Sequence, residues 1–136
     1  MAWAATIFRL STVTYSGWFT AWLLHQIFDF LHITISPPAF LALHNFIRKL
    51  AHVTEYTMFA LLLYGSFRGG RDLAWRARTA LLCFAITAGY SLTDEFHQWF
   101  VPGRGASLVD CGIDTSGAAF GLLAIYLRQR LFPSKA

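Results

Sequence analysis

The sequence predicts an all-α, polytopic integral membrane protein, a compact bundle of four transmembrane helices. Of its 136 residues, 56% are hydrophobic and only 13% are charged, whereas soluble domains carry about 25% charged residues. Four apolar segments run from Leu10 to Phe28, Leu50 to Phe67, Thr79 to Trp99 and Val109 to Leu131. Each approaches the roughly 20 residues that a helix needs to cross a bilayer. The length predicts a single domain over residues 1–136.

The first segment is expected to be a retained helix that leads into a long outer connection. Arg9 precedes an apolar run that is longer than the roughly 7–15 residues of a cleaved signal sequence and lacks its small-residue cleavage site. The stretch SPPAFLALHNFIRKL, residues 36–50, then enters the second segment. Because proline is favoured in the first turn of a helix, an interfacial helix or a re-entrant segment is expected here. A plain connection is the alternative.

Polar side chains recur at the start of the second segment, where the chain reads RKLAHVTEYTMF. Lys49, His52, Glu55 and Tyr56 are spaced by three and four residues. Side chains with this spacing lie along one stripe of a helix. Polar groups are costly in a bilayer, so such a stripe indicates a cavity or partner helices rather than lipid on this side.

Similar polar groups mark the end of the third segment. Asp94, Glu95 and Gln98 share a helix face there, and Arg104 follows in the third connection. If the four segments cross the membrane in turn, these groups lie at the same depth as the polar stripe of the second segment. The two sets are therefore expected to meet.

The fourth segment begins with a helix-capping pattern and continues with two small residues. Ser107 and Asp110 fit a capping box, which places a carboxylate at the positive end of the helix dipole. Asp114 lies one turn deeper. Gly117 and Gly121 form a GxxxG pattern, which lets another helix approach closely, so its expected role is packing.

Basic residues predict the orientation of the bundle. They gather near the N-terminus, in the second connection and at the C-terminus, which four spans bring to one side: Arg9, Arg68, Arg71, Arg76, Arg78, Arg128, Arg130 and Lys135. The positive-inside rule makes this side cytoplasmic, with both termini. It also explains the net charge of +4 without a nucleic-acid partner. The polar groups then lie at the outer face.

These groups predict a shared polar pocket, with a structural salt-bridge network as the alternative. Five carboxylates would contribute to it: Glu55, Asp94, Glu95, Asp110 and Asp114. Against the two positive charges of Lys49 and Arg104, they would leave an excess of three negative charges if all were ionised. Protonation, a bound cation, or contact with water or helix N-termini must offset this excess. His, Asp and Glu bind divalent metals, but a compact signature such as HExxH is missing, so metal ligands are not assigned.

The stretches KLAHVTEY and DEFHQWFVPGRGASLVDCGIDTSGAAFG resemble the VanZ-like family, small bacterial membrane proteins named after a teicoplanin-resistance protein. The resemblance covers about residues 49–121 and rests on Lys49, His52, Tyr56, Glu95, Gln98, Pro102, Arg104, Ser107, Asp110, Gly117 and Gly121. Asp114 departs from the family pattern, which more often has asparagine there. The resemblance implies a helical bundle in the bacterial cytoplasmic membrane and, for some members, reduced susceptibility to lipoglycopeptide antibiotics.

The residues favour a pocket that binds, and in one version modifies, a lipid-linked cell-envelope precursor or a phospholipid head group. Lys49 and Arg104 are expected to hold a phosphate. His52 and Glu95 are the acid–base candidates, and Asp110 is expected to orient a partner. The other expected ligand-binding residues are Glu55, Tyr56, Asp94 and Gln98. A divalent cation bridging phosphate and carboxylates would offset the negative charge.

Two other classes of function stay open. A proton- or cation-coupled carrier would need a polar path to the cytoplasm, and the inner halves of the second to fourth segments offer little beyond Tyr64, Ser66 and Thr87. A non-catalytic scaffold would bind a cell-envelope enzyme, or a second copy of the chain, through its exposed helix faces. Nothing in the sequence resembles a nucleotide-binding loop, so ATP-driven transport by this chain alone is not expected.

Overall fold

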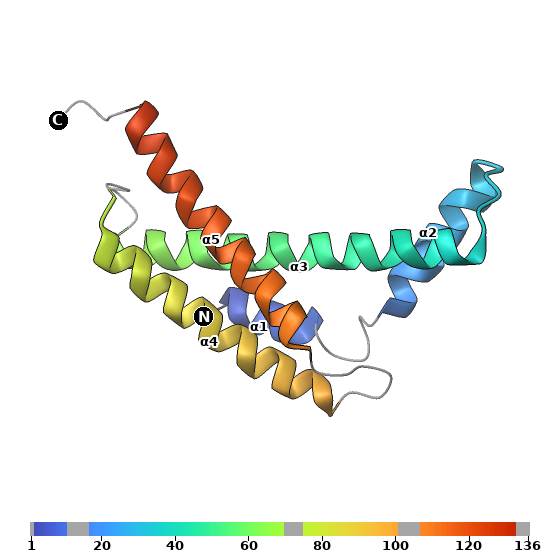
Figure 1. Cartoon of the computed structure of the whole chain (residues 1–136), viewed down its shortest axis with the longest axis horizontal. Helices are drawn as coiled ribbons and strands as arrows, with labels where there is room; N and C mark the ends of the chain where they lie inside the picture. Colours follow the sequence, from blue (N-terminus) through green and yellow to red (C-terminus); the bar gives the residue numbers. More distant parts are fainter. Residues whose placement is uncertain (1, 11–16, 70–74, 101–106, 133–136) are drawn as a thin grey trace.

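The computed structural model of the chain describes residues 2–10, 17–69, 75–100 and 107–132, which form five α-helices and no strand (Figure 1). In chain order the helices are α1 (Ala2–Leu10), α2 (Gly17–Phe30), α3 (Pro37–Phe67), α4 (Ala77–Trp99) and α5 (Leu108–Leu131). The prediction of an all-α fold is confirmed.

Only part of the predicted transmembrane arrangement is confirmed. Of the described helices, α5 alone is long and apolar enough to cross a membrane, by length and composition. α3 and α4 are less apolar because ionisable and hydroxyl side chains interrupt their apolar runs. The predicted first span overlaps α2, which has 14 residues, or about 21 Å of helix, against a hydrocarbon core of about 30 Å. Residues 11–16 of that span lie outside the described part of the chain.

The segment predicted to be interfacial or re-entrant is the beginning of α3. Ser36 is extended, and Pro37 and Pro38 form the first positions of the helix, where the fixed φ of proline is suited and its missing N–H is not needed. The helix then continues unbroken for 31 residues, about 46 Å at the usual rise. The helix start at the prolines is confirmed, and the re-entrant alternative is wrong.

Helix α5 packs along α3 in the most extensive contact between any two described helices, and α4 packs against both. A Cβ atom added to Gly117 would lie 2.4 Å from the backbone oxygen of Val53, and one on Gly121 would lie 2.9 Å from that of Thr57. The Thr57 hydroxyl also donates a hydrogen bond of 2.9 Å to the Gly117 carbonyl. The GxxxG pattern therefore packs α5 against α3, as predicted.

The bundle is less compact than predicted, because α2 packs on the first part of α3, away from α4 and α5 (Figure 1). The remaining part of α3 forms the bundle interior with its neighbours. One buried cluster there joins α3, α4 and α5 through Ala60, Tyr64, Cys83 and Leu122. α2 and the first turns of α3 thus form an arm outside the main core.

Helix α1 runs beside the last part of α4 and in the same direction. The Tyr90 hydroxyl donates a hydrogen bond of 2.6 Å to the carbonyl of Ala4, and the ring centroids of Phe8 and His97 lie 4.5 Å apart. Arg9 follows Phe8 and so lies near the end of α4, not near its beginning. The predicted grouping of Arg9 with the other basic residues is therefore wrong, because α1 lies beside the last part of α4.

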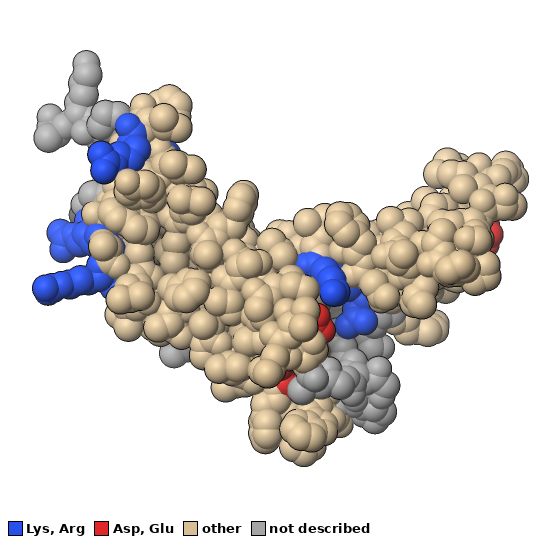
Figure 2. All heavy atoms as spheres, in the orientation of Figure 1, with Lys and Arg blue, Asp and Glu red and all other residues tan. Residues whose placement is uncertain are grey.

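The other basic groups do gather at one end of the molecule, which we call the basic end. The end of α3, the start of α4 and the end of α5 meet there (Figure 1). The backbone N–H of Arg76 donates a 2.7 Å hydrogen bond to the Tyr64 hydroxyl, and that of Trp75 donates to the Gln129 side chain. Figure 2 shows basic side chains at this end. Its described arginines are Arg68, Arg76, Arg78, Arg128 and Arg130; Arg71 and Lys135 lie outside the described residues.

Candidate functional site

A cavity of about 300 Å³ lies where the middle of α3 meets the end of α4 and the beginning of α5. We call it the polar cavity, because all but one of its lining residues are polar: Asn45, Arg48, Lys49, His52, Glu95, Gln98, Asp110, Ile113 and Asp114. It lies at the opposite end of α4 and α5 from the basic end. Figure 2 shows basic and acidic side chains next to one another in the middle of the molecule.

One wall of the polar cavity is a face of α3. Asn45, Arg48, Lys49 and His52 line it, and their spacings of three and four residues place them on one side of the helix. Lys49 is exposed and Arg48 is half-buried. Sequence reasoning found Lys49 and His52 but missed Asn45 and Arg48. Extending the same spacing by one turn toward the helix start would have found both.

Glu55 and Tyr56 lie outside the cavity lining, although both were predicted to bind the ligand. Tyr56 is fully buried in an apolar cluster with Ile7 and Phe59. The backbone carbonyl of Glu55 accepts a hydrogen bond of 3.0 Å from the Trp3 indole N–H. Neither residue lines the cavity, because α1 covers α3 at this turn, and their ligand-binding role stays a prediction.

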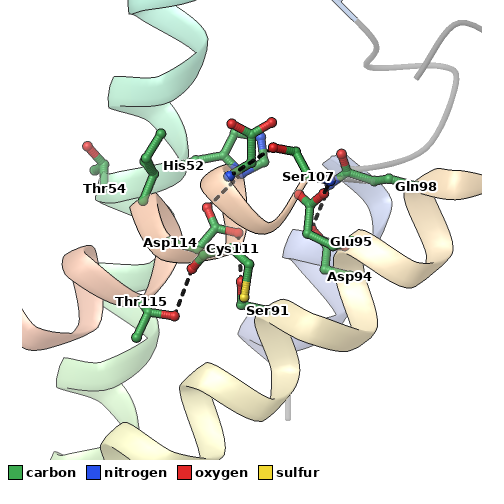
Figure 3. Close-up of polar contacts among 12 residues, drawn as sticks. His52, Thr54, Ser91, Asp94, Glu95, Gln98, Ser107, Cys111, Asp114 and Thr115 are labelled. Carbon is green, nitrogen blue, oxygen red and sulfur yellow. Dashed lines mark hydrogen bonds and ion pairs between the residues drawn. The ribbon is translucent and has the colours of Figure 1, made fainter. Parts of the chain in front are cut away.

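A second wall comes from the last turns of α4. Glu95 and Gln98 line the cavity and are buried. Asp94 lies behind them, and its Oδ2 accepts a hydrogen bond of 2.9 Å from Gln98 Nε2 (Figure 3). Asp94 is not among the residues that line the cavity, and its predicted role in ligand binding stays a prediction.

The third wall begins at the N-terminus of α5, where a residue of α4 takes part in capping α5. The Ser107 hydroxyl accepts a hydrogen bond of 3.3 Å from the backbone N–H of Asp110. In a capping box, a Glu or Gln side chain of the same helix accepts the hydrogen bond from the backbone N–H of the cap residue. Here Glu95 of α4 accepts it through Oε2, at 2.8 Å from Ser107 N. The Asp110 carboxylate is thereby left at the cavity wall. Arg104, the predicted phosphate ligand of the preceding connection, lies outside the described residues.

The floor of the polar cavity holds a chain of polar contacts between three helices (Figure 3). His52 Nδ1 of α3 lies 3.1 Å from Asp114 Oδ1 of α5. The Ser91 hydroxyl of α4 donates a hydrogen bond of 3.0 Å to Asp114 Oδ2. Donor atoms of His52, Asp94 and Asp114 lie within 4.8 Å of one another. The sequence predicted that His52 and Asp114 belong to one polar pocket, but it did not predict that Ser91 contacts Asp114 there.

The site carries more acidic than basic groups. Four carboxylates converge on it, from Asp94, Glu95, Asp110 and Asp114, against two cationic side chains, Arg48 and Lys49. If all were ionised, they would leave an excess of two negative charges (four minus two), or one with a protonated His52. In addition, no described residue hydrogen-bonds to the buried Oε1 of Glu95. The cavity can therefore accept protons or a cation, while its basic side chains can hold an anion.

Two kinds of chemistry are available in this arrangement. A guanidinium and an ammonium at Arg48 and Lys49 can hold phosphate oxygens, and Gln98 can orient a neighbouring polar group. Glu95 and His52 can accept or donate protons beside a bound ligand.

The model of a protein family described as VanZ/LLP1 matches residues 1–129 of the 136-residue chain. The match includes all residues that line the polar cavity. No curated protein and no solved structure matches the chain.

Proposed function

The chain belongs to the VanZ-like family, and from this we propose that it is a multi-pass protein of the bacterial cytoplasmic membrane that binds a phosphate-bearing lipid head group. The lipid is a phospholipid or a lipid-linked cell-envelope precursor. Family membership points to a role related to glycopeptide resistance. The observation that carries the proposal is the gathering of basic, amide and acid–base side chains around one cavity: Arg48, Lys49, Gln98, His52 and Glu95.

The membrane location is supported by the surface of the helices. Large apolar side chains are exposed on every described helix, among them Phe8, Trp18, Phe46, Leu81 and Phe120. Extensive exposed apolar surface marks contact with lipid or protein partners. We therefore propose that α3, α4 and α5 cross the bilayer with the basic end in the cytoplasm. The polar cavity would then face outward. Arg9 lies near the cavity end of α4 rather than at the basic end, so the predicted crossing by residues 10–28 and the predicted cytoplasmic N-terminus are not part of this proposal.

The orientation can be tested by labelling of single cysteines. A cysteine at Arg104 should react with a membrane-impermeant thiol reagent in intact cells, because the third connection lies on the cavity side. A cysteine at Arg130 should react only after the membrane is permeabilised, because it belongs to the basic end. Cys83 and Cys111 are buried, so the wild-type chain provides the unlabelled background. The reverse labelling pattern would place the cavity in the cytoplasm and contradict the proposal.

Within the proposed site, Arg48 and Lys49 hold the phosphate, together with Arg104 from the third connection. The forked guanidinium of Arg48 can form two parallel hydrogen bonds to phosphate oxygens, whereas the Lys49 ammonium acts as a point charge. Gln98 positions the ligand through its amide, and Asp110 orients a polar group of the head group or a water. Glu95 and His52 are the side chains that would transfer protons if the bound head group is modified.

Phosphate recognition can be tested with short-chain lipids and the purified full-length protein in detergent. We expect dihexanoyl phosphatidic acid to bind, and Arg48→Gln and Lys49→Gln each to weaken it about tenfold or more, as expected for one charge-assisted hydrogen bond. Arg128→Gln, which removes a charge at the basic end, should bind like the wild type. Unchanged affinity in the Arg48→Gln, Lys49→Gln double variant would contradict the proposal.

Two further ligands separate the contribution of the phosphate group to affinity from that of the acyl chains. Dihexanoylglycerol has the same acyl chains without the phosphate, and it should bind much more weakly than the phosphatidic acid. Inorganic phosphate tests the anion alone. Equal affinity for inorganic phosphate would identify a free anion as the ligand and contradict recognition of a lipid.

A further inference from the structure

We propose that the floor of the polar cavity is a divalent cation site formed by His52, Asp94 and Asp114. Each of these side chains comes from a different helix of the bundle: α3, α4 and α5. The site is separate from the basic wall at Arg48 and Lys49. It binds the ion without any lipid, so it stands independently of the proposed head-group binding.

The donor atoms are close enough for a single ion. One atom from each of the three side chains lies within 4.8 Å of the others, and His52 Nδ1 is 3.1 Å from Asp114 Oδ1. Ions with bonds of about 2.0–2.2 Å to nitrogen and oxygen hold their ligand atoms about 3–4 Å apart. Small side-chain rotations therefore suffice to bring all three donors to coordinating distance.

Burial makes a cation the natural partner of these carboxylates. Asp114 is 0% exposed and Asp94 is 3% exposed, and an ionised carboxylate is stable at such depth only with an opposite charge or a metal. Within the described residues, no group hydrogen-bonds to Asp114 Oδ1, although His52 Nδ1 lies beside it. A separation of 3.1 Å fits an imidazolium–carboxylate ion pair, and it is also the separation of two ligand atoms that share one ion.

Hydrogen bonds from neighbouring side chains fix the orientation of both carboxylates. The Ser91 hydroxyl donates to Asp114 Oδ2 at 3.0 Å, and Gln98 Nε2 donates to Asp94 Oδ2 at 2.9 Å (Figure 3). Outer-shell hydrogen bonds of this kind orient the ligands of metal sites. Ser91 and Gln98 are thus positioning residues for the ion.

The donor set indicates which ion binds. One imidazole with two carboxylates suits a first-row divalent ion such as Mn²⁺ or Zn²⁺, whereas sites for Mg²⁺ or Ca²⁺ usually consist of oxygen alone. His52 and Asp114 also line the polar cavity, so the remaining coordination positions face it. An imidazole that binds a metal through Nδ1 carries its proton on Nε2, so with the ion bound His52 could donate that proton and Glu95 would be the group that accepts one.

The test uses the metal alone, with the full-length protein stripped of metal in detergent. Loss of the free Mn²⁺ signal in electron paramagnetic resonance should show one ion bound per chain. Asp94→Asn and Asp114→Asn should weaken binding beyond the roughly 10–100-fold typical of an outer-shell loss, and Ser91→Ala should fall within that range. Asp29→Asn, an exposed carboxylate of α2, should bind like the wild type. Zn²⁺ should compete for the same site.

A measurement on the wild type covers the case in which the aspartate variants fail to fold. Pulsed resonance of the Mn²⁺ complex should show coupling to an imidazole nitrogen, and His52→Gln should remove that coupling. The proposal is overturned if the folded wild type binds neither Mn²⁺ nor Zn²⁺, if the nitrogen coupling is missing, or if a folded Asp114→Asn variant binds as tightly. Since lipid is left out of these assays, none of these results bears on phosphate binding at Arg48 and Lys49.

Discussion

Gly117→Ala should lower the stability of the folded protein, whereas Gly112→Ala in the same helix should be at least as stable as the wild type. A Cβ atom at position 117 would lie 2.4 Å from the backbone oxygen of Val53 and 3.1 Å from its Cα and carbonyl carbon. These are backbone atoms of α3 and cannot rotate away, so the two helices must move apart. Overpacking of this kind typically lowers the free energy of unfolding by about 1–3 kcal/mol, and occasionally by more.

The neighbouring glycines provide a graded control for this prediction. At Gly121 the nearest atom, the Thr57 oxygen, would lie 2.9 Å from an added Cβ, and at Gly112 nothing lies within 4 Å. Gly112→Ala should even add about 0.5–1 kcal/mol through helix propensity. The monodisperse fraction in size-exclusion chromatography and the thermal unfolding midpoint should therefore rank the variants in the order 112, 121, 117. A Gly117→Ala variant that unfolds at the wild-type temperature would mean that α3 and α5 do not pack through this glycine.

His52→Gln and Glu95→Gln should abolish the activity of the protein while leaving it folded. Both changes nearly preserve shape, and a glutamine at 95 can still accept the hydrogen bond that Glu95 Oε2 receives from Ser107 N. Glu95→Gln removes the charge of the carboxylate, and His52→Gln removes the imidazole, so neither variant can transfer a proton at the changed position. Loss of a general acid or base commonly lowers activity by about 100-fold or more. The readout is teicoplanin-type antibiotic susceptibility of cells expressing each variant, normalised to the amount of folded protein.

The control is Asp29→Asn, which changes a carboxylate on the arm formed by α2 and leaves the polar cavity intact. It should retain the wild-type phenotype. If His52→Gln and Glu95→Gln are both well folded and fully active, the cavity is structural and the scaffold function is favoured. If the two variants instead lose folded protein in proportion to activity, the main role of the polar side chains is to hold the helices together as a salt-bridge network.

Most boundaries of the long helices could be predicted because they depend on local signals, but the union of residues 36–50 with the second apolar segment in one helix was not. Pro37 and Pro38 start α3, Ser107 caps α5, and apolar runs set the extent of α4 and α5. The close contact at Gly117 could also be predicted, since a pair of small residues four positions apart is itself a packing signal. The first predicted segment, residues 10–28, is described only at Leu10, which ends α1, and from Gly17 onward, in α2.

The candidate site was predicted in its location but not in all of its members. His52, Lys49, Glu95, Gln98 and Asp110 line one cavity, and their convergence follows from polar spacing on helices that meet at one depth. Tyr56 shares that spacing, yet it is buried under α1. Arg48 and Asn45 lie on the cavity wall, one turn before the stripe that the polar pattern suggested.

The sequence by itself determined that the chain forms helices with polar groups near one end, because helical periodicity assigns each residue to a face of its own helix. Only the tertiary structure decided which faces meet. It brings Asp114 beside His52, places Glu95 where it accepts a hydrogen bond from the backbone N–H of the cap residue Ser107, and buries Tyr56 under α1. The physical reason is that spacing along a helix fixes the angle between its own side chains. The rotation of that helix against its neighbours comes from packing, here from the close approach of α5 to α3 at Gly117.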